Sequence, residues 1–413
     1  MEKCYKPVFS VEFNGQQILV DLTNKKNPFV NNEKEKNKEF YYSYSYEEDT
    51  NIPYFEIYVT DLCNMQCPYC FNNHSDNKKQ DKPLYEIESL VGFIKRKTPN
   101  KELGIKFLGG EPLLNKEWIY EFVSTLEKED LIINYNINTN LSVIDEKFMK
   151  FLKKYHFFTI VSVDGGNDPH KGGEFKGKIF QNIIKLLKED IVVSGRMVYY
   201  PNDKKSLTDL VKQCLNTGLK VVSITIPWGE KGNDKLLKIV QQNLREFADF
   251  YVDCILNKDF RYIGISPFIL YIKHLILERR CWKDNCSSGK DIYCIDIKGD
   301  IFPCHCFAGI ETFNCGSIYD EISEKKLFQK YDVDQIVPCF KCDIRYMCKA
   351  KCYGDNFLTN GEILRANNFR CLCEKEIFAC SVYILKEIMK NPEIFSIFKY
   401  VIEKGEKKYD NTK

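Results

Sequence analysis

The feature that most constrains the fold is an alternation of short apolar runs with amphipathic segments between about residues 54 and 267. Runs of strand length that alternate with segments of helical period are typical of βα units around a parallel sheet. Six such repeats predict an α/β fold with a partial (β/α)6 TIM-type barrel rather than the complete eightfold one. We predict strands at 54–60, 104–108, 132–139, 157–163, 192–199 and 221–226, and helices at 84–97, 116–128, 145–154, 178–188, 207–217 and 236–256.

Polar and metal-binding residues cluster at the points where these predicted strands end. In a parallel barrel the carboxyl ends of the strands share one mouth, and such folds place their chemistry there. We therefore expect a single site, with Trp228 either packed as a core aromatic or forming a wall of the cavity. The other candidates, in strand order, are Cys63, Cys67 and Cys70; Gly109, Gly110 and Glu111; Asn140; Ser162 and Asp164; and Arg196.

The first of these groups is a loop of three thiols. Cys63, Cys67 and Cys70 are separated by three and then two residues. Thiolates at this spacing can hold three irons of a [4Fe–4S] cluster and leave the fourth iron without a protein ligand. The spacing therefore predicts a cluster whose open iron chelates a small molecule.

The cysteine content supports metal ligation. The chain has 19 cysteines among 413 residues, and 13 of them fall between Cys281 and Cys380. The first residues lack the apolar segment of a secretory signal, and no run of about 18 uncharged apolar residues occurs. We therefore expect a cytoplasmic protein, where disulfides are rare and metal sites are the better explanation of many thiols. The net charge of +2 argues for neither a nucleic acid nor a membrane as the partner.

The chain divides into four predicted segments. Residues 1–50 carry two short alternating runs around Gly15, which predict a β-hairpin extension. This hairpin serves either as a cap on the main domain or as a shortened peptide-recognition arm with an edge strand. Residues 51–267 form the predicted barrel and residues 268–375 a cysteine-rich domain, while residues 376–413 form C-terminal helices and a charged tail.

The motifs in the first half resemble the signature of the radical S-adenosylmethionine (SAM) superfamily. The three-cysteine loop has the aromatic Tyr69 before its last cysteine, and a Gly-Gly-Glu-Pro motif follows the next strand at residues 109–112. The resemblance implies that the open iron chelates SAM, that the two glycines let the backbone approach the methionyl amine, and that Glu111 anchors the loop. It also implies that Asn140, Ser162 and Asp164 lie near ribose or substrate and that Arg196 neutralises the methionyl carboxylate.

The C-terminal cysteines resemble the seven-cysteine SPASM domain, named for maturases of subtilosin, pyrroloquinoline quinone, anaerobic sulfatases and mycofactocin. The match consists of Cys286-x12-Gly299-x4-Cys304, Cys339-x2-Cys342-x5-Cys348-x3-Cys352 and Cys371. It implies two auxiliary [4Fe–4S] clusters, and therefore three in all. The implied ligands are Cys286, Cys304 and Cys352, with Cys281 as an additional one, for the first auxiliary cluster, and Cys339, Cys342, Cys348 and Cys371 for the second.

Several cysteines leave alternatives open. Cys294 and Cys306 compete with Cys281, and Cys373 competes with Cys371. A zinc ribbon is the alternative for the four cysteines between Cys339 and Cys352, although it leaves the other three cysteines of the pattern without a role. The remaining cysteines are predicted to pack as small buried hydrophobes: Cys4, Cys214, Cys254, Cys315 and Cys380.

The combined resemblance implies an enzyme that makes a 5′-deoxyadenosyl radical and oxidatively modifies a residue of a ribosomally made peptide, forming a thioether or carbon crosslink. Its partners would be the precursor peptide or protein and an electron donor such as flavodoxin or ferredoxin. The alternative is an anaerobic sulfatase-maturing enzyme that forms formylglycine from Cys or Ser. Such maturases carry an aspartate after the Gly-x4-Cys element, where this chain has His305, a candidate proton acceptor or a structural neighbour of a cluster.

A non-catalytic iron–sulfur electron carrier is a further alternative. Such a protein would have no use for an open iron or for a loop that binds an amine, so the Gly-Gly-Glu motif argues against it.

Overall fold

The computed structural model describes residues 8–13, 15–21, 29–30, 52–67, 69–70, 72, 80–163, 172–199, 206–277, 288–320, 331, 333–345, 347–348 and 351–410. The predicted site residues Asp164, Cys281 and Cys286, together with Cys4, lie outside these residues.

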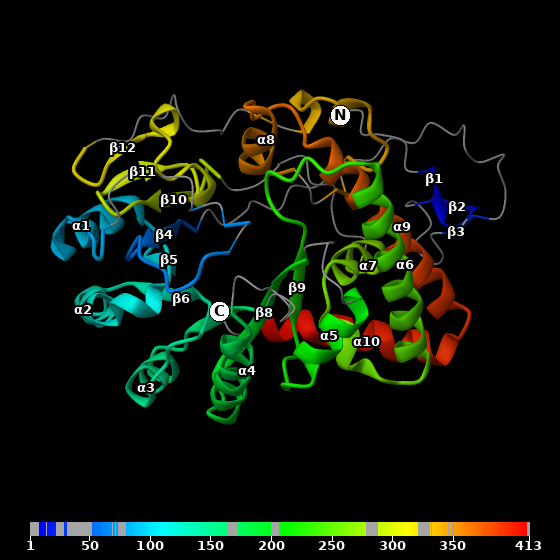
Figure 1. Cartoon of the computed structure of the whole chain (residues 1–413), viewed down its shortest axis with the longest axis horizontal. Helices are drawn as coiled ribbons and strands as arrows, with labels where there is room; N and C mark the ends of the chain where they lie inside the picture. Colours follow the sequence, from blue (N-terminus) through cyan, green and yellow to red (C-terminus); the bar gives the residue numbers. More distant parts are fainter. Residues whose placement is uncertain are drawn as a thin grey trace.

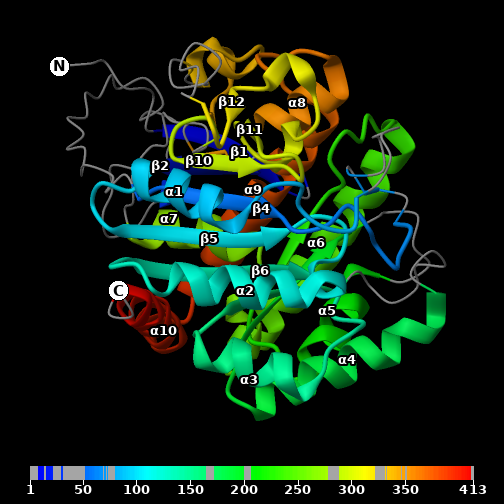
Figure 2. The same ribbon diagram turned by 90° about the vertical axis from the view of Figure 1, so that its left-hand side faces the viewer.

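A nine-stranded sheet organises the molecule (Figures 1 and 2). Its strand order is β12-β11-β10-β4-β5-β6-β7-β8-β9. The six predicted strands are all present, and every neighbouring pair from β4 to β9 is parallel, so the predicted α/β fold with a parallel sheet is confirmed. These strands are β4 (Tyr54–Tyr58), β5 (Glu102–Leu108), β6 (Ile132–Thr139), β7 (Phe158–Ser162), β8 (Val192–Val198) and β9 (Val222–Thr225).

Two strands, β4 and β5, differ from the predictions by two residues at one end, for local reasons. Strand β4 stops at Tyr58, before the predicted end at Thr60, because the Thr60 hydroxyl accepts a hydrogen bond from the Leu62 amide and turns the chain. Strand β5 begins two residues earlier than predicted, and Gly104 lies inside it. A Cβ at Gly104 would meet the Tyr54 ring at 2.2 Å, so this glycine serves close packing against the neighbouring strand rather than a turn.

The sheet continues past β4 into the cysteine-rich segment. Strand β10 (Ile292–Ile295) pairs parallel with β4, while β11 (Asp300–Phe302) and β12 (Gly316–Ser317) add antiparallel strands beyond it. Figure 1 shows these strands at the same edge as the start of the barrel. The segment that carries the later cysteines is therefore joined to the first strand of the barrel through backbone hydrogen bonds.

The helices between the strands cover the outer face of the sheet (Figure 1). Several begin at side-chain caps, as Asp145 accepts from the Phe148 amide at 2.8 Å and Ser206 from the Asp209 amide at 3.1 Å. Helix α4 begins earlier than the predicted Lys178, since glycines lowered the helix propensity of its first turns. The helices are α1 (Ile87–Lys97), α2 (Lys116–Leu126), α3 (Glu146–Lys154), α4 (Gly172–Lys188), α5 (Leu207–Leu215) and α6 (Asp234–Leu256).

The two faces of strand β4 have different roles. Phe55 and Ile57 are fully buried in the apolar core, and the Phe55 ring lies 6.1 Å from that of Phe93 on α1. Each such buried side chain contributes about 1.5–3 kcal/mol to folding. Because successive strand residues point to opposite faces, Glu56 and Tyr58 point to the other face of the sheet, away from the helices.

The remaining elements pack beside the barrel. Helix α9 (Asn368–Met389) lies against α6 and α7 (Phe268–Leu277), and it begins before the predicted C-terminal segment at residue 376. The strands β1 (Val8–Phe13), β2 (Gln16–Asp21) and β3 (Phe29–Val30) form a separate sheet. This sheet contacts α9, where Phe13 stacks on Tyr383 at 4.2 Å. The other helices are α8 (Tyr353–Asn360) and α10 (Pro392–Asp410), and the short 3-10 turns include η3 (Pro112–Asn115), η5 (His305–Phe307) and η9 (Cys339–Lys341).

Across the part of the chain that the structure describes, no helix has both the length and the apolar character that a membrane crossing requires.

Candidate functional site

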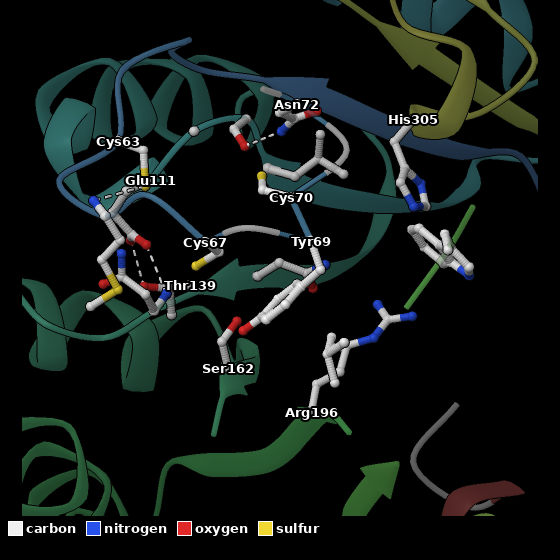
Figure 3. Close-up of a pocket in the computed structure, with 18 of the residues that line it drawn as sticks. Cys63, Cys67, Tyr69, Cys70, Asn72, Glu111, Thr139, Ser162, Arg196 and His305 are labelled. Atoms are coloured by element: carbon white, nitrogen blue, oxygen red, sulfur yellow. Dashed lines mark hydrogen bonds between the residues drawn. The ribbon is translucent and has the colours of Figure 1, made fainter. Parts of the chain in front are cut away.

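The carboxyl ends of the parallel strands surround a pocket (Figure 3). It holds about 1090 Å³ of space including its open mouth. Concave sites with a few converging polar groups are where small molecules and cofactors usually bind. Its lining includes Cys63, Cys67, Tyr69, Cys70, Gly109, Gly110, Glu111, Asn140, Ser162, Arg196 and His305 from the sequence predictions, and also Met65, Asn72, Leu108, Asn138, Thr139, Val198, Thr225, Ile226, Pro227 and Trp228.

The three predicted thiols lie together on the loop after β4. All of them line the pocket, with Cys63 exposed and Cys67 and Cys70 half-buried. The Cys70 amide donates to the Cys67 carbonyl at 3.1 Å, which keeps this part of the loop compact. Within the described ranges, no three His, Cys, Asp or Glu side chains are arranged to share one metal ion. A [4Fe–4S] cluster differs from a single metal ion, because each of three irons needs its own thiolate. Three thiols on one wall of a pocket suit this requirement.

The two glycines after β5 pack directly against the thiol loop. A Cβ at Gly109 would lie 2.3 Å from the Thr60 carbonyl oxygen, and one at Gly110 would lie 2.1 Å from that of Leu62. Gly109 also has a positive φ of 136°, which other residues rarely adopt. The structure therefore gives these glycines a role that the sequence did not indicate: they allow the second strand-end loop to touch the first.

Glu111 ties three strand-end segments together from a buried position. Its carboxylate accepts hydrogen bonds from the Leu113 amide at 3.1 Å, the Thr139 hydroxyl at 2.5 Å and the Asn140 amide at 2.7 Å. The side chain is only 1% exposed. A buried carboxylate with three donors is a strong anchor, because each hydrogen bond to a charged acceptor is stronger than a neutral one.

The opposite wall carries a cation and two aromatic rings. The Arg196 guanidinium lies 5.6 Å from the centre of the Trp228 ring, and this ring lies 5.3 Å from the His305 imidazole. Over the described residues, the Arg196 side chain makes no hydrogen bond or ion pair. Figure 3 shows Arg196 on the same side of the pocket as Ser162 and Tyr69. A half-buried cation without a counter-ion favours binding of an anionic group.

His305 is held by two charged residues that the sequence prediction missed. Glu56 accepts from the His305 amide at 2.8 Å and contacts Nδ1 of its imidazole at 2.7 Å, while Lys106 donates to the other Glu56 oxygen at 2.9 Å. Burial would raise the pKa of Glu56, but His305 and Lys106 outweigh it and hold that pKa well below its usual range. Burial lowers the pKa of His305 despite Glu56, and Lys106 and Arg196 lower it further.

The loop that carries Trp228 is fastened to the cysteine-bearing helices. The Gly229 amide donates to Asp355 on α8 at 2.8 Å, and Arg370 on α9 donates to the Ile226 carbonyl at 2.9 Å. Arg370 and Asp355 also form a buried ion pair at 3.0 Å. This ion pair joins one wall of the pocket to α8 and α9. Cys352 directly precedes α8, and Cys371 lies in the first turn of α9.

A second group of thiols lies near the start of α8. The Cys306 thiol hydrogen-bonds with Cys304 and Cys352. Cys352 caps α8 by accepting from the Asp355 amide at 3.4 Å, and the hydrogen bond from Cys306 contributes most to lowering the pKa of Cys352 to about 7. Cys294 and Cys306 were the two alternatives to Cys281. Cys306 contacts two of the predicted ligands directly, whereas Cys294 is buried on β10, where it pairs in register with Glu56.

A third group gathers around η9. Burial raises the pKa of Cys371 to about 12, and the nearby thiols of Cys339 and Cys342 contribute to this rise. Cys371 therefore lies close to both of them. Cys373 instead lies in the apolar core, only 1% exposed. The four cysteines of the zinc-ribbon alternative are therefore divided, because Cys352 contacts Cys306 while Cys339 and Cys342 are near Cys371.

The cysteines predicted to pack as hydrophobes mostly do so. Cys214, Cys315 and Cys380 are buried. Cys254 is half-buried, contrary to the prediction, because it lies near the end of α6, close to the exposed Lys258. Burial and Asp259 raise its pKa to about 11, so it remains a thiol at neutral pH.

Comparisons with known proteins identify a domain family in the first half of the chain. Residues 57–214 match the model of the radical SAM superfamily. The chain is 24% identical over 401 residues to the radical SAM cyclopropyl synthase TigE of Paramaledivibacter caminithermalis, an alignment that covers 87% of this chain and 78% of that protein. It is 24% identical over 349 residues to a cysteine-type anaerobic sulfatase-maturating enzyme of Clostridium perfringens, which covers 76% of this chain and 92% of that enzyme.

A solved structure shares the fold. The structure of anSMEcpe with bound AdoMet and Cp18Cys peptide superposes with a TM-score of 0.65 at 19% identity, over 84% of this chain and 100% of that one.

The region that matches the superfamily model contains both motifs of the pocket, the three-cysteine loop and the Gly-Gly-Glu turn. The family binds SAM and a [4Fe–4S] cluster, and both suit the residues assembled here. Residues 57–214 of this enzyme therefore form a domain that matches the radical SAM superfamily.

Proposed function

We propose that this enzyme forms a 5′-deoxyadenosyl radical from SAM and uses it to oxidise a residue of a ribosomally made precursor peptide, producing a thioether or carbon crosslink. The observation that carries this proposal is the composition of one pocket. Three loop thiols and the turn at residues 109–111 form one wall, and Arg196, Trp228 and His305 form the other. The first wall suits the cofactor and the second suits an additional polar substrate.

Two unsatisfied groups in the pocket support a bound SAM molecule. The side-chain oxygen Oδ1 of Asn138 is buried and has no hydrogen-bond partner within the described chain. Among the described residues, the Arg196 cation on the opposite side of the pocket has no counter-ion. A ligand with hydroxyl, amino and carboxylate groups would satisfy both, so we assign Asn138 and Asn140 to the ribose or amine, and Ser162 and Arg196 to the carboxylate, with Asp164 as a further candidate. A [4Fe–4S] cluster on Cys63, Cys67 and Cys70 would supply the electron that cleaves SAM.

His305 is the residue that we assign as proton acceptor. A two-electron oxidation of the peptide releases one hydrogen atom, one proton and one electron. The 5′-deoxyadenosyl radical would take the hydrogen atom and an auxiliary iron–sulfur cluster would take the electron, while His305 would hold the proton. His305 lines the pocket, and imidazole is the side chain whose unperturbed pKa lies nearest to neutral pH, which suits a group that accepts a proton during the reaction.

We also propose that residues 268–375 form a SPASM domain with two auxiliary clusters. Cys304 and Cys352 would belong to one, with Cys286 and Cys281, and Cys306 is a competing ligand because of its contacts. Cys339, Cys342, Cys348 and Cys371 would hold the other, and flavodoxin or ferredoxin would be the external electron donor. The barrel at 51–267, the extension at 1–50 and the helices from 376 onward complete the proposed organisation.

Formylglycine formation is the second candidate, favoured by the likeness to the sulfatase-maturating enzyme. The buried pairing of His305 with Glu56 favours the first candidate, since sulfatase maturases resembling this pattern carry an aspartate in place of His305. Both reactions remove two hydrogen atoms from the peptide, and formylglycine formation from Cys also replaces sulfur by oxygen. Formylglycine carries an aldehyde that forms a hydrazone with a hydrazide reagent, whereas a crosslink does not. Mass spectrometry after hydrazide treatment therefore separates the two outcomes.

The enzyme proposal has a direct test. After anaerobic reconstitution with iron and sulfide, the protein is expected to convert SAM to 5′-deoxyadenosine when dithionite supplies electrons, as measured by liquid chromatography with mass spectrometry. A protein with full iron content that forms none would contradict the proposal and favour the electron carrier.

The second auxiliary cluster is tested by two cysteines on one helix. Cys371→Ser is expected to lower the iron content by about four atoms per chain, because it removes a ligand of one [4Fe–4S] cluster. Cys373→Ser is the matched control, two residues further along α9 and facing the apolar core. It is expected to keep the iron content of the unaltered protein. Equal iron loss in both variants would overturn the assignment of Cys371.

A further inference from the structure

Leu141 has a backbone conformation that leucine rarely adopts. Its φ is 54°, in the left-handed region, and the residue is fully buried just after strand β6. The other described non-glycine residues with a positive φ are exposed and lie in the turns that follow helices: Lys101, His156, Asp190 and Lys258. Helices commonly end near a left-handed residue, which accounts for those four. A bulky buried residue in this region is strained, and strain of this kind concentrates at functional sites.

The loop of residues 139–142, which contains Leu141, forms one edge of the pocket. Thr139 and Asn140 line the pocket, and the Thr139 hydroxyl and the Asn140 main-chain amide both donate to the Glu111 carboxylate (Figure 3). The Asn140 side-chain amide donates at 3.0 Å to Asn64, which belongs to the three-thiol loop. The loop therefore joins the Gly-Gly-Glu turn to the thiol loop, and a change in its conformation would displace parts of both.

A buried polar residue on helix α4 holds Leu141 in this conformation. Asn182 is only 3% exposed and does not line the pocket. It lies at helical spacing among the buried apolar residues of α4, which are Ile179, Ile183 and Leu186. A buried amide needs a hydrogen-bond partner, and the Asn182 side chain donates to the Leu141 carbonyl at 2.9 Å. The Leu141 amide donates to the Thr139 hydroxyl at 2.8 Å, so the main chain of Leu141 is fixed on both sides.

We propose, building on the assignment of this pocket to SAM, that Asn182 is a positioning residue that keeps Leu141 at a positive φ and thereby holds the SAM-binding edge of the pocket in place. Without its amide, the buried Leu141 carbonyl would lose its donor, and rotation to a negative φ would relieve the strain. Because φ describes rotation about the N–Cα bond, this rotation turns the peptide group between Asn140 and Leu141. The Leu141 side chain is packed in the core, so Asn140 moves instead and its amide leaves Glu111.

The first test measures the loop itself. Asn182→Leu suits the apolar face of α4 and removes only the donor to Leu141. In the reconstituted protein without SAM, amide hydrogen exchange of a peptide that covers residues 139–142 is expected to be at least about tenfold faster than in the unaltered protein, as measured by mass spectrometry. The reason is that local opening of the loop no longer breaks the hydrogen bond from Asn182.

The second readout is the dependence of the reaction on SAM. For Asn182→Leu, the SAM concentration that gives half of the maximal 5′-deoxyadenosine formation is expected to rise at least about tenfold. The rate at saturating SAM should stay within about twofold of the unaltered protein, and the iron content should be unchanged. A raised KM with an unchanged kcat indicates that binding of SAM was lost. A general defect in folding would instead lower the iron content and the saturated rate.

A second variant reaches the same loop through its strain. Leu141→Ile keeps the volume of the buried side chain, but a β-branched residue adopts a positive φ even less readily than leucine. It is expected to change the exchange and the SAM concentration in the same direction as Asn182→Leu. Leu103→Ile is the matched control, because Leu103 is also fully buried but lies within the regular strand β5. A volume-conserving change there should leave both readouts within about twofold.

Asn243→Leu on α6 is the control for the asparagine. Asn243 accepts from the Leu207 amide at 3.3 Å and does not line the pocket, so its loss should leave both readouts unchanged. Unchanged exchange in Asn182→Leu, an equal effect of Asn243→Leu, or faster exchange with an unaltered SAM concentration would each overturn the inference. If the unaltered protein did not bind SAM, the proposed function would be wrong, whereas the exchange measurement would still decide whether Asn182 holds the loop.

Discussion

Replacement of Cys67 by alanine is expected to abolish 5′-deoxyadenosine formation. Cys67 is the middle thiol of the loop after β4 and lines the pocket beside Cys63 and Cys70. Removal of residues that only support a metal ligand already costs about 10–100-fold in affinity or activity, and loss of a ligand itself should exceed that range. We expect a rate more than about 100-fold below that of the unaltered protein, measured under dithionite with SAM in excess.

Cys254→Ala provides the control for this experiment. Cys254 is also half-buried, but it lies on α6 and is absent from the pocket lining. Alanine is a better helix former than cysteine, so the variant should fold and should retain its rate within about twofold. If Cys67→Ala kept a comparable rate, the assignment of the three-thiol loop to the SAM-cleaving cluster would be wrong.

Glu111→Gln is expected to destabilise the protein and to weaken SAM binding together. The two oxygens of Glu111 accept from Leu113, Thr139 and Asn140. An amide has only one acceptor oxygen, so its NH2 group would face a donor that the carboxylate now satisfies. We expect a loss of about 1.5–3 kcal/mol in the free energy of unfolding, measured by denaturant titration, and at least about tenfold weaker SAM binding, measured by calorimetry.

The matched substitution for Glu111 is Glu117→Gln at an exposed position on α2. Glu117 pairs with Lys147 at 3.4 Å, and its side chain is 80% exposed. Exposed pairs contribute little, so the unfolding free energy should change by less than about 0.5 kcal/mol and SAM binding should be unaffected. A similar small effect at Glu111 would show that its three hydrogen bonds do not hold the pocket together.

The parts of the fold that the sequence predicted well depend on local patterns. The strand at Ile132–Thr139 has the predicted limits, and the other five parallel strands differ by one or two residues at an end. Their apolar runs are followed by polar residues of the kind that begin helices. Such local patterns distinguish a strand from a helix without information on which segments pack together in the fold. The residues at their carboxyl ends converge because parallel strands bring those ends to one edge, so Cys63, Gly109 and Ser162 share one pocket.

The residues that sequence analysis missed act across long separations. Glu56 and His305 are 249 positions apart, and their contact forms because β10 adds to the edge of the barrel beside β4. The only local signal was a charged residue within each of two apolar runs, at Glu56 and Lys106. A charge in a strand does not reveal its partner, because the partner depends on register and on which segment closes over the sheet.

The choice between neighbouring cysteines was also beyond the sequence. Cys371 and Cys373 both lie near the end of the cysteine pattern, and spacing alone left them in competition. The structure separates them, because two residues along a helix differ by about 200° in direction at about 3.6 residues per turn. Cys371 therefore lies near Cys339 and Cys342, while Cys373 packs in the core.

The sequence by itself determined the order of strands and helices, the three-thiol loop and the Gly-Gly-Glu turn, since each is written in consecutive residues. Only the tertiary structure decided what stands opposite them: the Arg196 and Trp228 wall, and His305 held by Glu56. The physical reason is that spacing along the chain specifies local geometry, whereas contacts between distant segments follow from strand register and packing.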